Sequence, residues 1–258
     1  QETVAVLLRG GPGTLKTQTM QHLSHALVSA VIAPEKRDAF NNNPERFIYN
    51  RSAETEYWDG YDQDKIVTTI DDLLQMRDVA GGGDSEVFNV IRAINENAYD
   101  LHMAELSNKG NTKFKSEFLI CTTNSADLKV QSIHDKGALL RRLKRAYTVV
   151  PKDEYKKTTS ATSDMSHKVD FAKLPIGPLG ITTTNPDDIL EFHEYDLMGR
   201  VHTGKILNFK ELVEAVLSDR NFSKLCYEQK VLELKTRRGE YSCEPQSSMR
   251  FKIPGLFP

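Results

Sequence analysis

A glycine-rich loop between a buried-strand pattern and a helical pattern constrains this chain more than any other feature. Residues 10–17 read Gly-Gly-Pro-Gly-Thr-Leu-Lys-Thr, after the apolar run 4–8 and before helical spacing over residues 20–31. A loop of this composition turns backbone N–H groups toward a phosphate, and the following helix adds its positive end. The order of strand, loop and helix therefore predicts a site that holds a triphosphate.

The last two positions of the loop carry the side-chain chemistry. Lys16 is expected to reach the β- and γ-phosphates, and the hydroxyl of Thr17 to ligate Mg²⁺. Leu15 stands where the usual pattern has glycine, so the strict pattern fails at that position. The alternative interpretation is a glycine-rich turn with a surface lysine. The predicted phosphate-binding residues are Gly10, Gly11, Pro12, Gly13, Thr14, Leu15, Lys16 and Thr17.

Length, charge and cysteine usage limit the classes of protein that fit. A chain of 258 residues can bury the core of one large domain. The net charge of −2 means that any nucleic-acid binding depends on local patches. Cys121, Cys226 and Cys243 lack the spacing of zinc ligands or of a disulfide framework. No apolar run has the length of a membrane span, and we expect an upstream segment that is absent from this chain.

Strand patterns alternate with helical patterns in the first part of the chain. This alternation predicts an α/β fold with a mostly parallel sheet of about five strands and helices on both faces. The expected strands are residues 4–8, 47–50, 65–70, 117–121 and 146–150, the expected helices are residues 17–31 and 87–106, and the expected loops are residues 78–85 and 152–168.

A smaller α+β region is expected after residue 150. Short strands at residues 189–195 and 204–207 would form a hairpin, and residues 209–217 and 223–236 have helical spacing. The apolar residues 249–258 include two prolines and cannot form a regular helix. They are expected to dock either on the chain's own sheet or on a neighbouring subunit. We therefore predict a core at residues 1–150 and a region at residues 151–258 that completes the same domain.

An acidic pair follows the β-branched strand pattern of residues 65–70. A phosphate loop needs such a partner, because one carboxylate holds the water shell of Mg²⁺ and the other polarises the attacking water. We assign Asp71 to the metal and Asp72 to the water. The alternative is a turn, since Asp-Asp often ends a strand.

Two further polar features lie downstream. The apolar strand pattern of residues 118–121 runs into Thr-Thr-Asn, and the amide of Asn124 is placed to hydrogen-bond the γ-phosphate or the attacking water. A simple turn residue is the alternative. Arg141 and Arg142 follow an apolar segment, and arginine neutralises the charge that develops during phosphoryl transfer. The alternative for these two residues is a solvated basic stretch.

Taken in order, these motifs resemble the superfamily 3 helicases, also called 2C-like ATPases, of picorna-like positive-strand RNA viruses. The resemblance covers residues 4–150 and, more weakly, residues 192–216. It rests on the phosphate loop and on residues 57–61, 70–72, 103–110, 114–116, 122–124 and 140–142.

The resemblance implies a P-loop NTPase of the AAA+ type that forms hexameric rings in its full-length form, with nucleotide between neighbours. It assigns phosphate and metal binding to the loop and acidic chemistry to Asp71 and Asp72. It makes Asn124 a polar sensor, and it makes Arg141 and Arg142 groups that act on the neighbour's nucleotide. Lys109 matches the basic residue of a loop that lines the central pore, where single-stranded RNA would bind. The zinc-binding cysteine cluster of some relatives is absent from this sequence.

The expected function is Mg²⁺-dependent ATP hydrolysis by a viral non-structural replication protein, coupled to RNA binding or remodelling. The expected cofactors are ATP and Mg²⁺. The expected partners are single-stranded RNA, other copies of the chain, other viral replication proteins and, through the absent segment, a membrane. The expected location is the host cytoplasm, at membrane-bound replication sites. The alternatives are a P-loop kinase, for which no acceptor pocket or lid is marked, and a nucleotide-gated assembly or membrane-tethering module in which Leu15 weakens catalysis.

Overall fold

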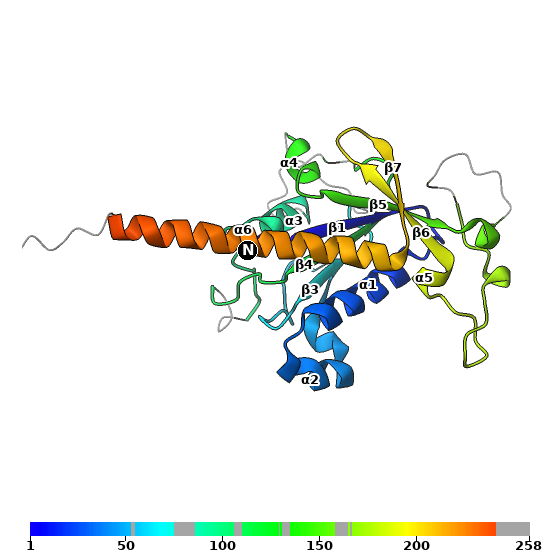
Figure 1. Ribbon diagram of the computed structural model, residues 1–258, viewed down its shortest axis with the longest axis horizontal. Coiled ribbons are helices and arrows are strands. Elements are labelled where there is room, and N and C mark those ends of the chain that lie inside the picture. The colour runs from blue at the N-terminus through cyan, green and yellow to red at the C-terminus, as the bar shows by residue number, and fades with distance from the viewer. Residues whose placement is uncertain are drawn as a thin grey trace, which may run out of the picture.

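A seven-stranded sheet with the strand order β2-β3-β4-β1-β5-β6-β7 forms the centre of the molecule (Figure 1). The computed structural model describes residues 1–52, 55–74, 86–105, 110–128, 130, 135–157, 165 and 167–240, with only the backbone at residues 238–240. The strands are β1 (Val4–Arg9), β2 (Ile48–Arg51), β3 (Val67–Ile70), β4 (Phe118–Thr123), β5 (Arg145–Pro151), β6 (Leu190–Asp196) and β7 (Val201–Leu207).

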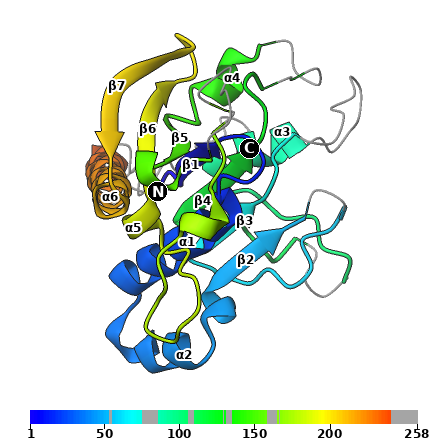
Figure 2. The same ribbon diagram turned by 90° about the vertical axis from the view of Figure 1, so that its right-hand side faces the viewer.

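Helices cover both faces of this sheet. Figure 2 shows α1 on one side of the sheet and α3 and α4 on the other, with α6 seen end-on beside β6 and β7. The α-helices are α1 (Lys16–Val31), α2 (Arg37–Asn42), α3 (Glu86–Ile94), α4 (Gly137–Leu140), α5 (Pro186–Ile189) and α6 (Phe209–Glu240). Short 3-10 turns occupy Pro34–Lys36, Pro44–Phe47, Asp153–Tyr155 and Phe171–Lys173.

The predicted fold class is confirmed by the strand directions. The strands from β2 to β5 in the sheet order are parallel, as the alternation of strand and helix patterns predicts. The expected C-terminal hairpin is present as β6 and β7: β6 pairs antiparallel with β5, and β7 pairs antiparallel with β6. Because these strands extend the same sheet, we propose that residues 151–240 and the preceding residues form one folding unit.

The alternation of side chains along β1 divides the core into two layers. Val6 and Leu8 belong to the apolar cluster shared with α1 and α6, whereas Leu7 belongs to the cluster shared with α3 and α4. All three side chains are fully buried. A strand buried on both faces reads as a continuous apolar run, which is why residues 4–8 lack polar alternation.

The helix predicted over residues 87–106 is wrong in its second half, since α3 ends at Ile94. Residues 95–105 contain no helix, and the backbone N–H of Phe114 donates to the Tyr99 carbonyl over 2.9 Å. The rings of Tyr99 and Phe114 both pack edge-on against the buried Trp58. Long-range aromatic packing therefore outweighs local helical spacing in this segment.

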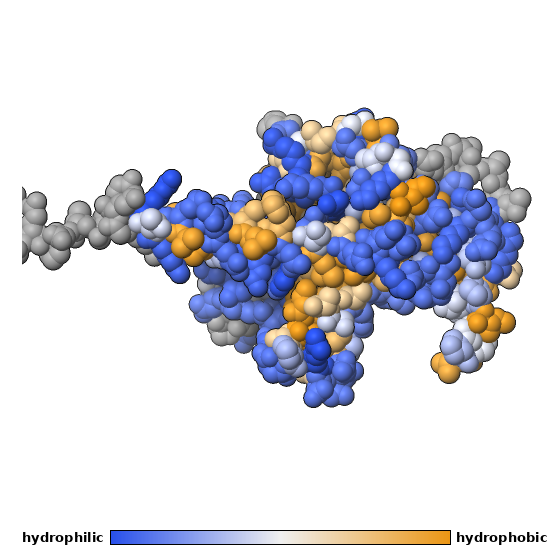
Figure 3. All heavy atoms as spheres, viewed as in Figure 1, coloured by the Kyte–Doolittle hydropathy of each residue, from blue (hydrophilic) through white to orange (hydrophobic). Residues whose placement is uncertain are grey.

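The two helices predicted over residues 209–217 and 223–236 form one helix, α6, whose C-terminal end projects beyond the rest of the molecule (Figure 1). The space-filling view shows isolated apolar side chains among hydrophilic ones on this projecting part (Figure 3). The exposed apolar residues along α6 include Phe222, Leu225, Tyr227, Leu232 and Leu234. None of the helices in the described part of the chain is both long and apolar enough to cross a membrane.

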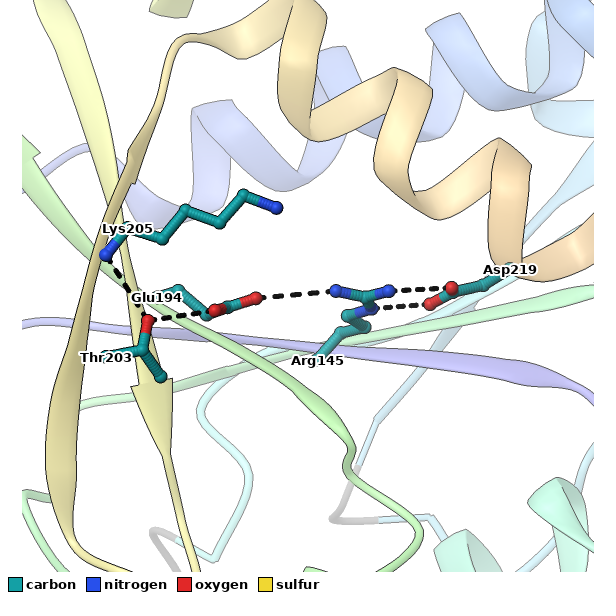
Figure 4. A network of polar contacts seen from close by, with 5 residues as sticks. All are labelled: Arg145, Glu194, Thr203, Lys205 and Asp219. Carbon is teal, nitrogen blue, oxygen red and sulfur yellow. Dashed lines mark hydrogen bonds and ion pairs between the residues drawn. The ribbon is translucent and has the colours of Figure 1, made fainter.

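Ion pairs hold the middle of α6 against the sheet. Asp219 accepts two hydrogen bonds from Arg145, over 2.5 Å and 2.7 Å, and Glu194 of β6 lies 3.4 Å from the same guanidinium (Figure 4). The next residue, Arg220, donates to Glu117 over 2.6 Å. The hydrogen bonds that Arg145 donates to Asp219 raise the pKa of the guanidinium further above its ordinary value, so this arginine stays charged. Asp219 and Arg220 lie between residues 217 and 223, where the sequence predicted a break between two helices. These contacts stabilise the helix across that break.

Two predictions fall outside the described residues. The loop predicted at residues 78–85 and the apolar tail predicted at residues 249–258 both lie outside the described residues. The connection predicted at residues 152–168 is described in part. It includes the turn Asp153–Tyr155 and an isolated bridge between Lys156 and Val169.

Asp219→Ala is expected to lower the free energy of unfolding by about 1–2 kcal/mol, because a charge-assisted pair with each side chain about 30% exposed is lost. Alanine is the better helix former, which opposes the loss slightly. Urea unfolding followed by circular dichroism measures the change. Glu228→Ala, at an exposed position on the same helix, is the control and is expected to change stability by less than about 0.5 kcal/mol. Equal stability of the two variants would show that the pair does not hold α6 in place.

Candidate functional site

The polar ends of three strands meet at one edge of the sheet. Strand β4 lies between β1 and β3, with Ile70 paired to Cys121 and Leu8 paired to Thr122. The backbone N–H of Gly10 donates to the Thr123 carbonyl over 3.2 Å, which fixes the start of the glycine-rich loop beside the end of β4. Ligands of parallel α/β sheets bind at this carboxyl edge.

The loop between β1 and α1 is tight, and two of its glycines are needed for its shape. A Cβ atom at Gly10 would stand 2.8 Å from the Thr14 hydroxyl, a distance that requires one of the two to shift. Gly13 has a φ of +82°, a conformation that side chains disfavour. The Thr14 hydroxyl donates to the Gly11 carbonyl over 3.0 Å and closes the turn.

The ammonium group of Lys16 lies inside this turn. It donates to the Gly11 carbonyl over 2.9 Å and to Asn124 Oδ1 over 2.7 Å. Only 7% of Lys16 is exposed. Burial lowers the pKa of Lys16, while the nearby carboxylates of Asp72 and Asp71 oppose that shift. The lysine is therefore a desolvated cation with two neutral acceptors, which bind it less strongly than phosphate oxygens would.

Asn124 connects Lys16 to the acidic pair. Its Oδ1 accepts from Lys16, and its Nδ2 donates to Asp72 Oδ1 over 2.6 Å. Only one orientation of the amide satisfies an ammonium on one side and a carboxylate on the other. The structure thus brings together three residues that the sequence predicts for the site.

Thr17 and Asp71 form a second connection beside the first. The Thr17 hydroxyl donates to the Asp71 carboxylate, at 3.0 Å from Oδ2 and 3.3 Å from Oδ1. Both residues are exposed to solvent, and a pocket of about 400 Å³ between α1, β2 and β3 opens beside them. A hydroxyl and a carboxylate are hard oxygen donors, and Mg²⁺ binds few protein ligands while it keeps several waters. The donor set at Thr17 and Asp71 fits this ion.

Thr122 is a site residue that sequence reasoning did not assign. Its hydroxyl donates to Asp71 Oδ1 over 2.5 Å and accepts from the backbone N–H of Asp72 over 2.8 Å. It therefore fixes the Asp71 carboxylate and the turn at Asp72 together. The sequence does show two threonines, Thr122 and Thr123, directly before Asn124. The carboxylate that Thr122 contacts, however, depends on the register between β3 and β4, which the sequence does not reveal.

Comparison with known proteins identifies the core of this chain. Residues 6–125 match the family described as RNA helicase, which includes every residue of the two connections above. The match and the relatives below confirm the resemblance to the superfamily 3 helicases of picorna-like viruses.

Viral polyproteins are among the proteins that resemble this chain. The chain is 34% identical to the replicase polyprotein of Drosophila C virus over 187 residues, which are 71% of the chain and 10% of the polyprotein. It is 37% identical to the replicase polyprotein of cricket paralysis virus over 152 residues, 58% of the chain and 8% of the polyprotein. It is 30% identical to the genome polyprotein of human rhinovirus 1A over 157 residues, 61% of the chain and 6% of the polyprotein. The matches thus span a tenth or less of each relative.

Leu15, the departure from the glycine-rich pattern, has a local explanation in the helicase core. Its φ of +62° is left-handed, the conformation that makes glycine usual there. Its side chain is only 5% exposed and belongs to the apolar cluster between the sheet and α1. The loop keeps the required backbone shape, and the leucine adds a core contact.

The arginines predicted to act in trans do not join this site within one chain. Arg141 donates to the Gly137 carbonyl over 3.0 Å and lies 3.4 Å from Asp135, and Arg142 donates to the Ala138 carbonyl over 2.9 Å. Within the described residues, neither makes a hydrogen bond or ion pair to the phosphate loop or to Asp71. Lys109, the predicted RNA contact, lies outside the described residues.

Substitution of Leu15 separates backbone strain from core packing. Leu15→Ala is expected to destabilise the fold by about 2–5 kcal/mol, because it removes a buried side chain and keeps the left-handed strain. Leu15→Gly removes the same side chain but relieves strain of about 1–2 kcal/mol, so it is expected to be the more stable variant. Thermal unfolding of both variants, with the unchanged chain as reference, gives the order. An alanine variant at least as stable as the glycine variant would contradict the left-handed backbone at this position.

Proposed function

We propose that this chain binds ATP and Mg²⁺ at the carboxyl edge of its sheet and hydrolyses ATP as a replication protein of a picorna-like virus. The observation that carries the proposal is the pair of connections Lys16–Asn124–Asp72 and Thr17–Asp71 around one phosphate loop. In the first connection, a lysine suited to bind phosphate is linked through Asn124 to the carboxylate of Asp72. In the second, a hydroxyl suited to bind a metal ion is hydrogen-bonded to the carboxylate of Asp71. The match of residues 6–125 to the RNA helicase family supports nucleotide use in general.

Lys16 is proposed to bind the β- and γ-phosphates. Phosphate oxygens would replace the Gly11 carbonyl and Asn124 Oδ1 as acceptors, and charge-assisted bonds would then replace neutral ones. Backbone N–H groups at the start of α1 add the positive end of that helix. Because this cation is already in place before the substrate arrives, the site does not have to reorganise to stabilise the charge that develops during phosphoryl transfer.

Asp72 is proposed to accept a hydrogen bond from the attacking water and to orient it toward the γ-phosphate. The bond from Asn124 Nδ2 occupies one oxygen of this carboxylate, which leaves the other oxygen for the water. Asn124 also bonds to Lys16, so its amide is proposed to hold the phosphate-binding lysine and the Asp72 carboxylate at a fixed distance from each other. Bound at Thr17 and Asp71, Mg²⁺ would neutralise charge on the phosphates, and Thr122 would hold the Asp71 carboxylate in position.

The further parts of the proposal concern partners. Single-stranded RNA is proposed to bind through backbone contacts and Lys109, without reading of its sequence. The exposed position of Arg141 supports action on the nucleotide of a neighbouring subunit in a hexameric ring. The replicase relatives support a role in the host cell beside other viral replication proteins. Cytoplasmic, membrane-bound replication sites, reached through a segment outside this chain, are part of the same proposal.

Lys16→Ala is expected to lower the rate of phosphate release from ATP by about 100-fold or more, because it removes the cation from the centre of the loop. The measurement is steady-state phosphate release with and without single-stranded RNA. Lys224→Ala, which removes an exposed lysine of α6, is the control and is expected to keep the rate. Unchanged release by Lys16→Ala would place hydrolysis at a different site.

The two carboxylates are expected to respond differently to substitution. Asp71→Asn is expected to raise the Mg²⁺ concentration needed for half-maximal activity, since a neutral amide binds the ion less strongly. Asp72→Asn is expected to bind ATP within about threefold of the unchanged chain while its turnover falls about 100-fold. Mg²⁺ titration of phosphate release and calorimetric ATP binding measure the two effects. Exchanged phenotypes would reverse the assignments of metal and water.

Arg141→Ala and Arg142→Ala test whether the site is shared between subunits. Each variant is expected to bind ATP and to turn it over more slowly, because a neighbour would lack its guanidinium. Mixing either variant with Lys16→Ala is expected to restore part of the activity, since mixed interfaces contain both groups. Specific activity should rise with protein concentration. Activity independent of dilution, without rescue on mixing, would eliminate a shared site.

A further inference from the structure

The segment after β5 returns to the phosphate loop and is fixed there by backbone hydrogen bonds. The N–H of Val169 donates to the Gly13 carbonyl over 3.1 Å, and the N–H of Lys157 donates to the Lys168 carbonyl over 2.9 Å. Lys156 and Val169 also form an antiparallel bridge. The Val169 side chain is buried in the apolar cluster beneath the loop. Val169 therefore holds residue 168 beside the phosphate loop, and the bond from Lys157 fixes the backbone of residue 168.

The side chain of Lys168 lies against Gly13. A Cβ atom built on Gly13 would stand 3.9 Å from Lys168 Cγ, which is ordinary van der Waals contact. Lys168 is exposed, and its ammonium lies beyond Cγ at the end of a flexible stem. A lysine that covers the bare backbone of a glycine in the loop can turn its charge toward a phosphate held by that loop.

The ammonium of Lys168 differs from those of nearby lysines because it has no partner among the described residues. Lys152 donates to the carbonyls of Asp187 and Asp188, over 3.0 Å and 2.8 Å. Lys156 donates to Asp153 over 2.6 Å. An unpaired cation next to a loop that turns N–H groups inward adds to the positive potential there.

We propose that Lys168 is a second cationic ligand of the polyphosphate chain, supplied by the same subunit from the segment after β5. This assignment rests on the proposed function and extends it, since Lys16 would contact the phosphates from inside the turn and Lys168 from the side of Gly13. Lys168 contacts phosphate and not the base or the sugar. Its contribution therefore grows with the number of phosphates on the nucleotide.

Lys168→Gln is expected to weaken ATP binding about tenfold, because one charge-assisted contact is lost. The measurement is competition of ATP, ADP and AMP against a fluorescent ATP analogue, with Mg²⁺ and at fixed salt. The loss is expected to be largest for ATP and absent for AMP, and Lys168→Arg is expected to stay within about threefold of the unchanged chain. Lys224→Gln has the same change in net charge and is expected to bind ATP as the unchanged chain does.

Lys16→Ala is measured beside these variants, so that failure of this assignment and failure of the proposed function give different results. If Lys16→Ala loses ATP binding while Lys168→Gln keeps it, the assignment of Lys168 is overturned and the proposed site stands. An equal loss of ATP and AMP binding by Lys168→Gln also overturns it, since the contact would not be to the phosphate chain. If the unchanged chain binds no ATP, the proposed function and the assignment both fall.

Discussion

Strand β4 hydrogen-bonds to β1 on one side and to β3 on the other, and this pairing fixes where the polar ends of all three strands lie. Because side chains alternate along a strand, a slip of one residue would turn Thr122 away from Asp71 and move its apolar neighbours out of the core. The buried side chains of β4 thus specify the register, and the register aligns the hydroxyl, the carboxylates and the phosphate loop. The core and the proposed chemistry depend on the same strand.

Burial of Lys16 has a cost that the surrounding groups offset. Desolvation lowers its pKa, whereas the carboxylates of Asp71 and Asp72 and the hydrogen bonds to Gly11 and Asn124 favour the charged form. A cation held in a dry turn interacts more strongly with an incoming anion than a hydrated one does. A buried cation therefore needs several polar partners. The carboxyl edge of the sheet supplies them, because the polar ends of neighbouring strands meet there.

From the sequence alone it was possible to predict that Lys16, Asp72 and Asn124 lie close together. Lys16, Asp72 and Asn124 each end or follow a strand pattern, and parallel strands bring such ends together. Features that depend on distant partners were not predictable. The hydroxyl of Thr122 bridges two acidic residues only in one register, α6 runs on because Arg145 pairs with it, and α3 ends early because Trp58 lies beside the following segment. In each case a contact between residues far apart in the sequence determines the structure, and the local spacing of apolar residues does not reveal that contact.

The central claim is that the ends of β1, β3 and β4 form one nucleotide site. Hydrogen–deuterium exchange of the chain with and without a non-hydrolysable ATP analogue and Mg²⁺ tests it most directly, because it locates the site without turnover. The account predicts slower exchange in peptides that cover residues 10–17, 70–74 and 122–126, with no change over residues 48–51 or 209–217. Unchanged exchange in all three peptides, or protection confined to other segments, would contradict it.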